Sequence, residues 1–95
     1  MESRFRDSFL RDISGIRNPG MLALIHEAIT NVETGKSILE VRNLKKLKGS
    51  RIAFRIKAKE YRIGIFIENG VVEFTRCLHR REIYKYFPQG KSRRS

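Results

Sequence analysis

The 95-residue sequence predicts an α+β fold, in which a helical hairpin lies on one face of a small antiparallel sheet and a short helix follows the last strand. Two periodicities support this prediction. Apolar residues in the first third of the chain recur every three to four positions, as on one face of a helix. In the second half they alternate with polar residues, as in a half-buried strand. A helical hairpin with one apolar side needs a flat apolar surface to cover, and the sheet supplies it.

Two helices are expected in the first third of the chain. The first runs from Asp7 to Ile16. Asn18 suits the N-cap of the second helix and Pro19 suits its first turn, and Gly35 ends it. The apolar positions are Phe9, Leu10, Ile13 and Ile16 in the first helix and Met21, Leu22, Ile25, Ala28, Ile29 and Val32 in the second.

Three strands are expected after a mixed connector at residues 37–47, and residues 2–5 are a candidate for one more short strand. Residues 51–57 and 61–67 alternate cleanly. The dipeptide Asn69-Gly70 then predicts a tight hairpin into the third strand, 71–78. In that strand Arg76 shares a side with apolar residues, which indicates that both faces are partly covered. A short helix or turn at 81–87 ends at Pro88.

The length predicts a single domain, residues 1–88, followed by a loose basic tail at 89–95. The apolar runs are far shorter than the ~20 residues that cross a bilayer, and no signal peptide is recognisable. We therefore expect a cytoplasmic protein without a membrane partner. Cys77 is the only cysteine, so we expect a buried or half-buried thiol, without disulfide, zinc site or other cofactor.

The net charge is +11, from 21 Lys and Arg against 10 Asp and Glu. Such an excess destabilises the folded chain by self-repulsion, and it is usually retained because an anion binds to it. Nucleic acid is the first candidate partner, an acidic protein the second and an anionic membrane surface the third. A generally basic, well-solvated surface is the alternative.

The alternation places cations on the sheet face that the helices leave open. Arg55 and Lys57 lie two residues apart, about 7 Å, on one strand, and Arg62 lies on the next. Arg80 follows the third strand. Together these groups suit a phosphodiester, although Lys and Arg also protect solvated sheet edges from aggregation. The aromatic residues nearby, Phe66, Tyr84 and Tyr86, either stack on single-stranded RNA bases or pack under the last helix.

Signals for catalysis are otherwise few. The chain has no Gly-rich phosphate loop and no Ser-His-Asp arrangement. His26 lies mid-helix and fits an exposed or half-packed structural residue. His79 lies beside Arg80 and Arg81, whose positive charges favour a neutral imidazole that can relay a proton.

Four short motifs follow one another in order: K-L-K-G at 46–49, F-R-I-K at 54–57, Y-R-I-G at 61–64 and H-R-R-E-I-Y at 79–84. Their order and spacing resemble the RelE/ParE superfamily of toxins from bacterial toxin–antitoxin systems, and most closely its RelE-like branch. The helical hairpin ahead of the sheet fits the architecture of that superfamily.

The resemblance implies an endoribonuclease that cuts messenger RNA in the ribosomal A site. The RNA's own 2′-hydroxyl attacks the adjacent phosphate, so the protein needs no nucleophile, only in-line positioning and charge stabilisation. By position, the resemblance implies catalytic roles for Lys57 (proton acceptor or charge stabiliser), Arg62 (scissile phosphate), Arg80 (leaving group), Tyr84 (substrate contact) and His79 (acid–base). It implies RNA binding by Lys48, Arg55, Phe66 and Arg81.

The resemblance also implies a partner and leaves alternatives open. A cognate antitoxin, acidic or amphipathic, is expected to form a toxin–antitoxin heterocomplex by covering the sheet or displacing the last helix. ParE-type toxins share the fold but inhibit DNA gyrase without cutting RNA, and a basic RNA- or ribosome-binding module is a further alternative. The retained set Arg55, Lys57, Arg62, Arg80 and Tyr84 favours RNA cleavage.

Overall fold

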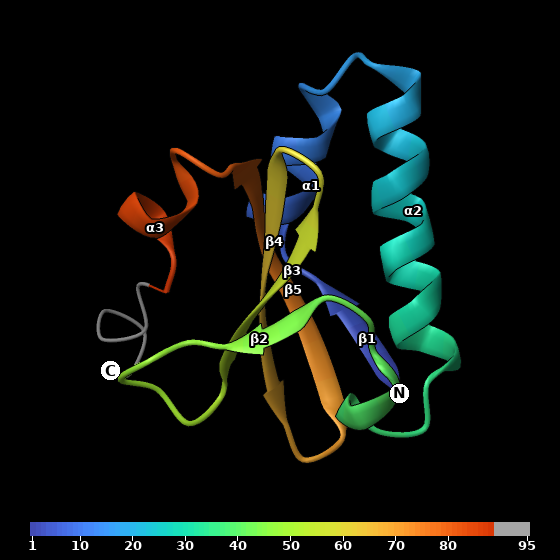
Figure 1. Cartoon of the computed structure of the whole chain (residues 1–95), viewed down its shortest axis with the longest axis vertical. Helices are drawn as coiled ribbons and strands as arrows, with labels where there is room; N and C mark the ends of the chain where they lie inside the picture. Colours follow the sequence, from blue (N-terminus) through green and yellow to red (C-terminus); the bar gives the residue numbers. More distant parts are fainter. Residues whose placement is uncertain (89–95) are drawn as a thin grey trace.

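The computed structural model describes residues 1–88, which form a five-stranded sheet between two unequal helical layers (Figure 1). In chain order the elements are β1 (Glu2–Phe5), α1 (Asp7–Ser14), α2 (Pro19–Thr34), the 3₁₀ turn η1 (Ile38–Glu40), β2 (Leu44–Lys46), β3 (Ala53–Ala58), β4 (Tyr61–Glu68), β5 (Val71–His79) and α3 (Ile83–Tyr86). The strand order is β1-β5-β4-β3-β2. Helices α1 and α2 cover one face, and α3 lies over the other. The predicted α+β architecture is confirmed, while the tail predicted at 89–95 lies outside the described residues.

Two features of the sheet differ from the prediction. The sheet is mixed rather than antiparallel, because β1 pairs with β5 in parallel, with Glu2 opposite Val71. Because most of the chain lies between β1 and β5, no hairpin turn joins the two strands and forces them to run antiparallel. The second feature is β2, which lies inside the expected connector and pairs with β3. Three residues are too few to show an alternating pattern in the sequence.

The helical hairpin begins and ends much as the sequence predicts. The side chain of Asn18 accepts a hydrogen bond from the backbone N–H of Met21 (3.0 Å), so it is the N-cap of α2. Helix α1 ends at Ser14, two residues before the expected end, yet Ile16 is still buried. Among the described residues, no helix is long and apolar enough to span a membrane.

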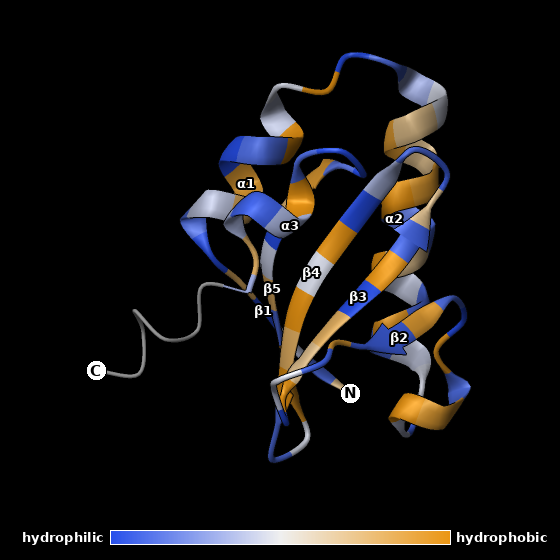
Figure 2. Cartoon of the chain, turned by 60° about the vertical axis from the view of Figure 1, so that its left-hand side comes forward, coloured by the Kyte–Doolittle hydropathy of each residue, from blue (hydrophilic) through white to orange (hydrophobic). Residues whose placement is uncertain are grey.

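The main core lies between the helical hairpin and the sheet. Figure 2 shows the alternation along β3 and β4 as successive hydrophobic and hydrophilic bands. Most of the apolar residues that the alternation turns toward the helices are buried, including Phe54, Ile56, Ile63 and Ile65, whereas Tyr61 and Ile67 are only partly buried. The largest fully buried side chains of this core are Phe9, Ile25, Val32, Ile63, Ile65, Val72, Phe74 and Cys77.

A second, smaller core lies on the opposite face, under α3. It is formed by Ala53, Phe66, Ile83 and Phe87, and the rings of Phe66 and Phe87 are 5.0 Å apart between centroids. Phe66 is only 6% exposed, so the expectation that it stacks on RNA bases is wrong. It supports α3 instead, because burying its ring there removes more apolar surface from water than any exposed position would.

A β-bulge in β5 accounts for the ambiguous parity of that strand. Gly64 lies opposite Arg76 and the next residue, Ile65, lies opposite Phe74, so Thr75 is the extra residue. Up to Phe74 the strand follows the expected alternation. Beyond Thr75 the two faces are exchanged, so that Cys77 faces the helical hairpin.

The β4–β5 hairpin has the predicted two-residue turn. Asn69 and Gly70 both adopt positive φ, 51° and 76°, as a type I′ turn requires. This turn lies at the opposite end of the hairpin from Tyr61 and His79, the residues that pair where β4 begins and β5 ends.

Candidate nucleic-acid interface

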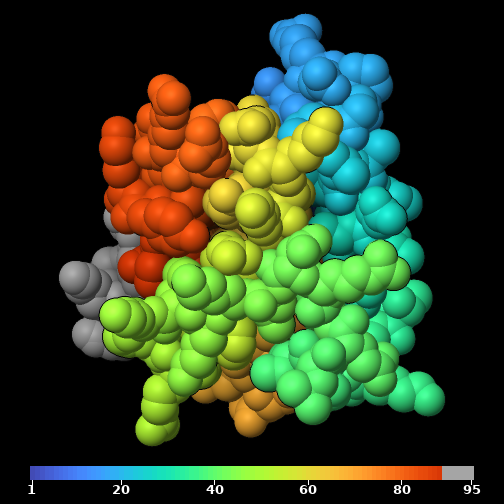
Figure 3. All heavy atoms as spheres, in the orientation of Figure 1, coloured from blue at the N-terminus to red at the C-terminus, as the bar shows by residue number. Residues whose placement is uncertain are grey.

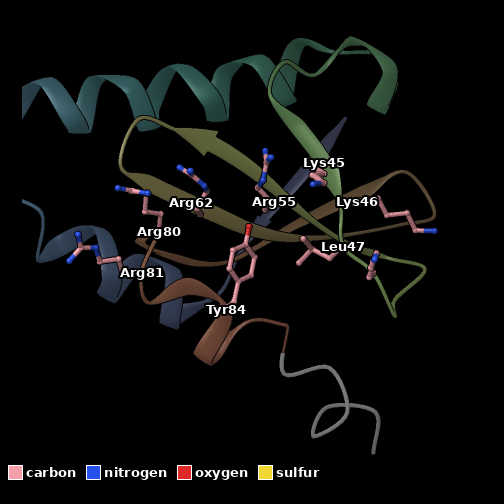
Figure 4. Close-up of a pocket in the computed structure, with 9 residues that line it drawn as sticks. Lys45, Lys46, Leu47, Arg55, Arg62, Arg80, Arg81 and Tyr84 are labelled. Carbon is pink, nitrogen blue, oxygen red and sulfur yellow. The ribbon is translucent and has the colours of Figure 1, made fainter.

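A hollow of about 530 Å³ lies on the open face of the sheet, between β2, β3, β4 and α3. We call it the basic hollow, because seven of its nine lining residues are Lys or Arg and the other two are uncharged (Figure 4). The lining residues are Lys45, Lys46, Leu47, Lys48, Arg55, Arg62, Arg80, Arg81 and Tyr84. None of these described residues is acidic, so the hollow concentrates positive charge on one surface.

Strand pairing brings the central cations together. Lys45 on β2 lies opposite Arg55 on β3, and Arg55 lies opposite Gly64 on β4. Arg62 is two residues from Gly64 on β4, so its side chain projects from the same face. Figure 4 shows Lys45, Arg55 and Arg62 side by side across the sheet. This row of cations therefore runs across β2, β3 and β4, and each strand contributes one residue.

Backbone carbonyls hold the two central arginines in place. Arg55 donates from Nη1 to the carbonyl oxygen of Asn43 (2.7 Å). Arg62 donates from Nη1 to the carbonyl oxygens of Lys59 (2.7 Å) and Tyr61 (3.0 Å). A guanidinium has five N–H donors, so each arginine keeps several of them for a phosphate group.

Arg80 is held by the β3–β4 turn. Its Nε lies 3.1 Å from a carboxylate oxygen of Glu60, and its backbone N–H donates to the carbonyl oxygen of Glu60 (2.7 Å). The two side chains are about half exposed, so this ion pair is screened by water and orients Arg80 more than it stabilises the fold.

The remaining wall of the basic hollow is α3, which presents Tyr84. Ile83 and Phe87 anchor this helix in the smaller core and leave the Tyr84 side chain 54% exposed. In Figure 4 its hydroxyl points across the hollow toward the arginine row. Figure 3 shows β2, the β3–β4 hairpin and α3 adjoining on one face of the molecule. An exposed aromatic ring beside several cations suits a base attached to a phosphate chain.

Six of the predicted site residues meet in the basic hollow: Lys48, Arg55, Arg62, Arg80, Arg81 and Tyr84. Sequence reasoning did not assign a role to Lys45, Lys46 or Leu47, which arrive with β2. Two of them, Lys46 and Leu47, belong to the K-L-K-G motif, which was the sequence signal that could have pointed to them. Only the pairing of β2 with β3 places Lys45 beside Arg55.

Lys57 lies next to the basic hollow without lining it. Lys57 pairs with Arg62 in the β3–β4 register and lies one residue beyond Ile56, where the pairing of β3 with β2 ends. There it lines a separate hollow of about 430 Å³ against α2, together with Leu24, Ala28 and Ile56. As predicted, Lys57 and Arg62 lie on the same face of the sheet, because they are directly paired, although they line different hollows.

His79 lies on the other side of the sheet from the basic hollow. It pairs with Tyr61, its ring meets that of Tyr61 edge-on at 5.9 Å, and it lines a hollow of about 700 Å³ beside the α1–α2 connection. Its Nδ1 accepts a hydrogen bond from the backbone N–H of Arg81 (3.1 Å). Its Nε2 lies 3.9 Å from the Glu60 carboxylate oxygen that also holds Arg80. His79 and Arg80 therefore meet at Glu60, although the bulge at Thr75 turns His79 toward the helices and only Arg80 lines the basic hollow.

The strongest perturbations of ionisable groups lie under the bulge. Burial raises the pKa of the Cys77 thiol to about 12, and nearby Asp12 adds to the effect. The hydrogen bond from Arg76 to Asp12 raises the pKa of that arginine, which therefore remains charged. Among residues 1–88, no group of three or more His, Cys, Asp and Glu side chains could hold a metal ion.

Comparison with known proteins agrees with this fold. The chain is 33% identical over 90 residues to Toxin RelE3 of Methanocaldococcus jannaschii, an alignment covering 93% of this chain and 100% of that protein. A chain in the crystal structure of the RelB–RelE antitoxin–toxin complex from Methanococcus jannaschii matches with a TM-score of 0.75 and 31% identity, covering 90% of this chain and 99% of that one. A chain of the RelBE2 toxin–antitoxin complex from Mycobacterium tuberculosis has the same fold, with a TM-score of 0.62 and 24% identity over 83% and 96% of the two chains. No family model matches the sequence.

The fold and the basic hollow thus define a small, basic α+β protein of the toxin class found in toxin–antitoxin modules. The identity and coverage shared with Toxin RelE3 make the assignment specific. This chain belongs to the RelE toxin family, as the four sequence motifs indicated.

Proposed function

We propose that this chain is the toxin of a toxin–antitoxin module and that it inhibits translation as an endoribonuclease, cutting messenger RNA in the ribosomal A site. The observation that carries the proposal is the basic hollow, in which seven cations and one exposed tyrosine meet without an acidic residue in its described lining. A site of this kind can grip an RNA phosphate and a neighbouring base, and it leaves the nucleophile to the RNA.

The proposed reaction is an intramolecular transesterification. The 2′-oxygen of the RNA attacks the adjacent phosphorus, the bond from phosphorus to the 5′-oxygen of the next nucleotide breaks, and the products are a 2′,3′-cyclic phosphate and a free 5′-hydroxyl. One proton leaves the 2′-hydroxyl and one reaches the departing 5′-oxygen. Both transfers are balanced without a metal or a cofactor.

Each lining residue has a role in this reaction. Arg62, held by two carbonyls, binds the non-bridging oxygens of the scissile phosphate and stabilises their growing charge. Arg80 lies near the leaving oxygen and Tyr84 contacts a base. The cations at the rim bind flanking phosphates: Lys45, Lys46, Lys48, Arg55 and Arg81.

Lys57 is the better of the two proposed proton-transfer residues. It lies opposite Arg62 on the open side of the strand register, whereas His79 pairs with Tyr61 on the side of the helices. Replacing Lys57 by Gln is expected to change the pH profile of cleavage, and replacing His79 by Gln is expected to leave the profile as it is. Single-turnover cleavage measured across pH distinguishes the two residues.

The proposal includes a cognate antitoxin and a cytoplasmic location. Two of the similar structures are toxin–antitoxin complexes, and a net charge of +11 suits an acidic or amphipathic partner segment. Co-expression with the product of the neighbouring gene is expected to yield one heterocomplex by size exclusion and mass measurement. A toxin that elutes alone would contradict this part of the proposal.

The test of cleavage is to map the 5′ ends of messages after brief induction. Wild type is expected to produce cuts in phase with codons, and Arg62→Ala or Arg80→Ala is expected to abolish both the cuts and the toxicity. Arg11→Ala is the matched control, because it removes the same charge from an exposed position on α1 that does not line the basic hollow. Intact messages with arrested replication would instead support a gyrase inhibitor of the ParE type.

A further inference from the structure

Three residues other than glycine have a positive φ among the described part of the chain: Asn43 (61°), Lys59 (55°) and Asn69 (51°). This left-handed conformation is disfavoured for residues with a side chain, and a lysine tolerates it less well than an asparagine. Strained conformations of this kind persist where the surrounding structure imposes them, often at functional sites. Their positions are therefore informative.

At Asn43, the left-handed conformation directs the carbonyl toward β3. The carbonyl oxygen accepts two hydrogen bonds, from the backbone N–H of Lys57 (3.1 Å) and from Nη1 of Arg55 (2.7 Å). The preceding residue is fixed as well, because the backbone N–H of Arg42 donates to the side chain of Asn31 on α2 (2.8 Å). The helix and the strand thus hold the carbonyl that orients Arg55.

At Lys59, the same conformation occurs at the β3–β4 turn. The Lys59 carbonyl accepts the hydrogen bond from Nη1 of Arg62 (2.7 Å). The next residue, Glu60, holds Arg80 through its backbone and its side chain. The turn therefore orients two of the arginines that line the basic hollow.

We propose that Asn43 and Lys59 are positioning residues, whose left-handed conformations aim two carbonyls at Arg55 and Arg62 and so fix both guanidinium groups for phosphate binding. The proposal rests on the proposed function, since RNA is the ligand that the fixed arginines would bind. The carbonyl dipoles offset the mutual repulsion of the neighbouring guanidinium groups. They also restrict the side chains before the ligand arrives, which lowers the entropy lost on binding.

Glycine and valine substitutions separate the backbone from the side chain. Both Asn43→Gly and Asn43→Val remove the amide, and both Lys59→Gly and Lys59→Val remove the ammonium group. Glycine adopts a positive φ freely, whereas a β-branched residue strongly resists it. The glycine variants are expected to keep the carbonyls in place, and the valine variants are expected to turn them away.

Asn69 supplies the matched control. It has the same conformation but lies in the β4–β5 turn, lining a hollow with Phe66 and Glu68 rather than the basic hollow. Asn69→Val is expected to lower the melting temperature as the other valine variants do, without changing ligand binding. Where a valine variant does not fold, the corresponding alanine variant takes its place.

The first measurement is binding of a short single-stranded oligoribonucleotide with 2′-O-methyl groups, which cannot be cleaved, by fluorescence anisotropy. Each of Asn43→Val and Lys59→Val is expected to weaken binding by about tenfold, the size of one misplaced charge-assisted contact. The glycine variants are expected to bind within about twofold of wild type. Glycine variants as weak as the valine variants would show that the side chains act, and would overturn the proposal.

The second measurement needs no RNA. Rotation of the Arg55 and Arg62 guanidinium groups, followed by ¹⁵N NMR, is expected to be slow in wild type and in the glycine variants and fast in the valine variants. If wild type fails to bind the oligoribonucleotide while this pattern holds, the proposed function is wrong and the positioning role stands. If all variants rotate alike, the positioning role is wrong.

Discussion

At the scale of single residues, Gly64 decides where α3 can lie. A Cβ added there would stand 2.6 Å from two ring atoms of Phe87, closer than any side chain tolerates. The ring of Phe87 can therefore pack against β4 only because β4 carries no side chain at this point. Phe87 in turn holds α3, and α3 presents Tyr84 to the basic hollow.

We expect Gly64→Ala to destabilise the fold by about 1–3 kcal/mol, because the ring of Phe87 has to move. It is also expected to reduce RNA cleavage at temperatures where the variant is still folded, since α3 is displaced with its tyrosine. Thermal unfolding and a cleavage assay measure the two effects. Gly15→Ala is the control, because its added Cβ would meet its nearest neighbour at 3.6 Å in open helical geometry.

Cys77 predicts a pH dependence of stability. Burial raises the pKa of its thiol from 9.0 to about 12 in the folded state, so between these values the unfolded chain has lost the proton and the folded chain keeps it. Unfolding then releases a proton, and this group's contribution to the free energy of unfolding falls by about 1.4 kcal/mol for each pH unit above 9. Below pH 9 the contribution is constant.

The measurement is urea unfolding of wild type and Cys77→Ala across pH 8 to 11. The difference between the two proteins is expected to be flat at the lower end and to shrink as pH rises. Comparing the two proteins removes the titration of Lys and Tyr, which both share. A difference that stays constant to pH 11 would contradict the raised pKa.

At the scale of elements, α1 completes the bulge of β5. The hydroxyl of Ser8 donates to the Thr75 carbonyl (2.6 Å), and Asp12, one turn later, accepts from the backbone N–H of Cys77 (2.8 Å) and pairs with Arg76 (2.8 Å). A bulge leaves backbone groups without partners in the sheet, and an unpaired buried group is costly. The helix therefore satisfies the polar groups that the extra residue frees.

Asp12→Ala is expected to cost about 2–4 kcal/mol, because it leaves the Cys77 N–H and a half-buried guanidinium without their partner. Chemical denaturation of the single and double variants of Asp12 and Arg76→Met gives the coupling energy of the pair. We expect the double variant to be less destabilised than the sum of the two single variants. Strict additivity would show that the ion pair does not support the bulge.

At the scale of the whole molecule, the positive charge both favours an anionic partner and destabilises the folded chain. A net charge of +11 opposes folding through self-repulsion. Seven of the lysines and arginines line the basic hollow, where the phosphates of an RNA strand can neutralise them. Binding that releases counterions from RNA weakens as salt rises. For single strands the slope of log K against log salt is about −0.7 for each phosphate contact.

We therefore expect oligoribonucleotide binding to have a slope of up to about −5, for seven contacts, and Arg81→Gln to reduce its magnitude by about 0.7. Anisotropy titrations over a range of salt concentrations measure both values. Arg11→Gln, which removes the same charge outside the hollow, is expected to leave the slope unchanged. Equal slopes for Arg81→Gln and wild type would place Arg81 outside the interface.

Sequence alone determined most of the helices and strands, because the spacing of apolar residues that predicts each one is a local property of the chain. The stripe on α2, its Asn18 cap and the Asn69-Gly70 turn depend only on neighbouring residues, and the structure confirms them. Strand alternation likewise placed Arg55 and Arg62 on the open face, where both line the basic hollow. Lys48, Arg81 and Tyr84 also line it, but they were named from the resemblance to RelE toxins, and the roles of all these residues stay predictions. The resemblance to RelE toxins rested on the four motifs, and the comparisons confirm it.

Only the tertiary structure decided the features that depend on long-range pairing. The parallel β1–β5 pair, the alignment of Lys45 with Arg55 and the burial of Phe66 each join residues far apart in the chain. The bulge at Thr75 had the largest effect, since one extra residue reverses every side chain beyond it. That reversal turns His79 toward the helices and out of the basic hollow, although it still meets Arg80 at Glu60. No local pattern in the sequence marks the bulge, because it depends on which residue of β4 each residue of β5 pairs with.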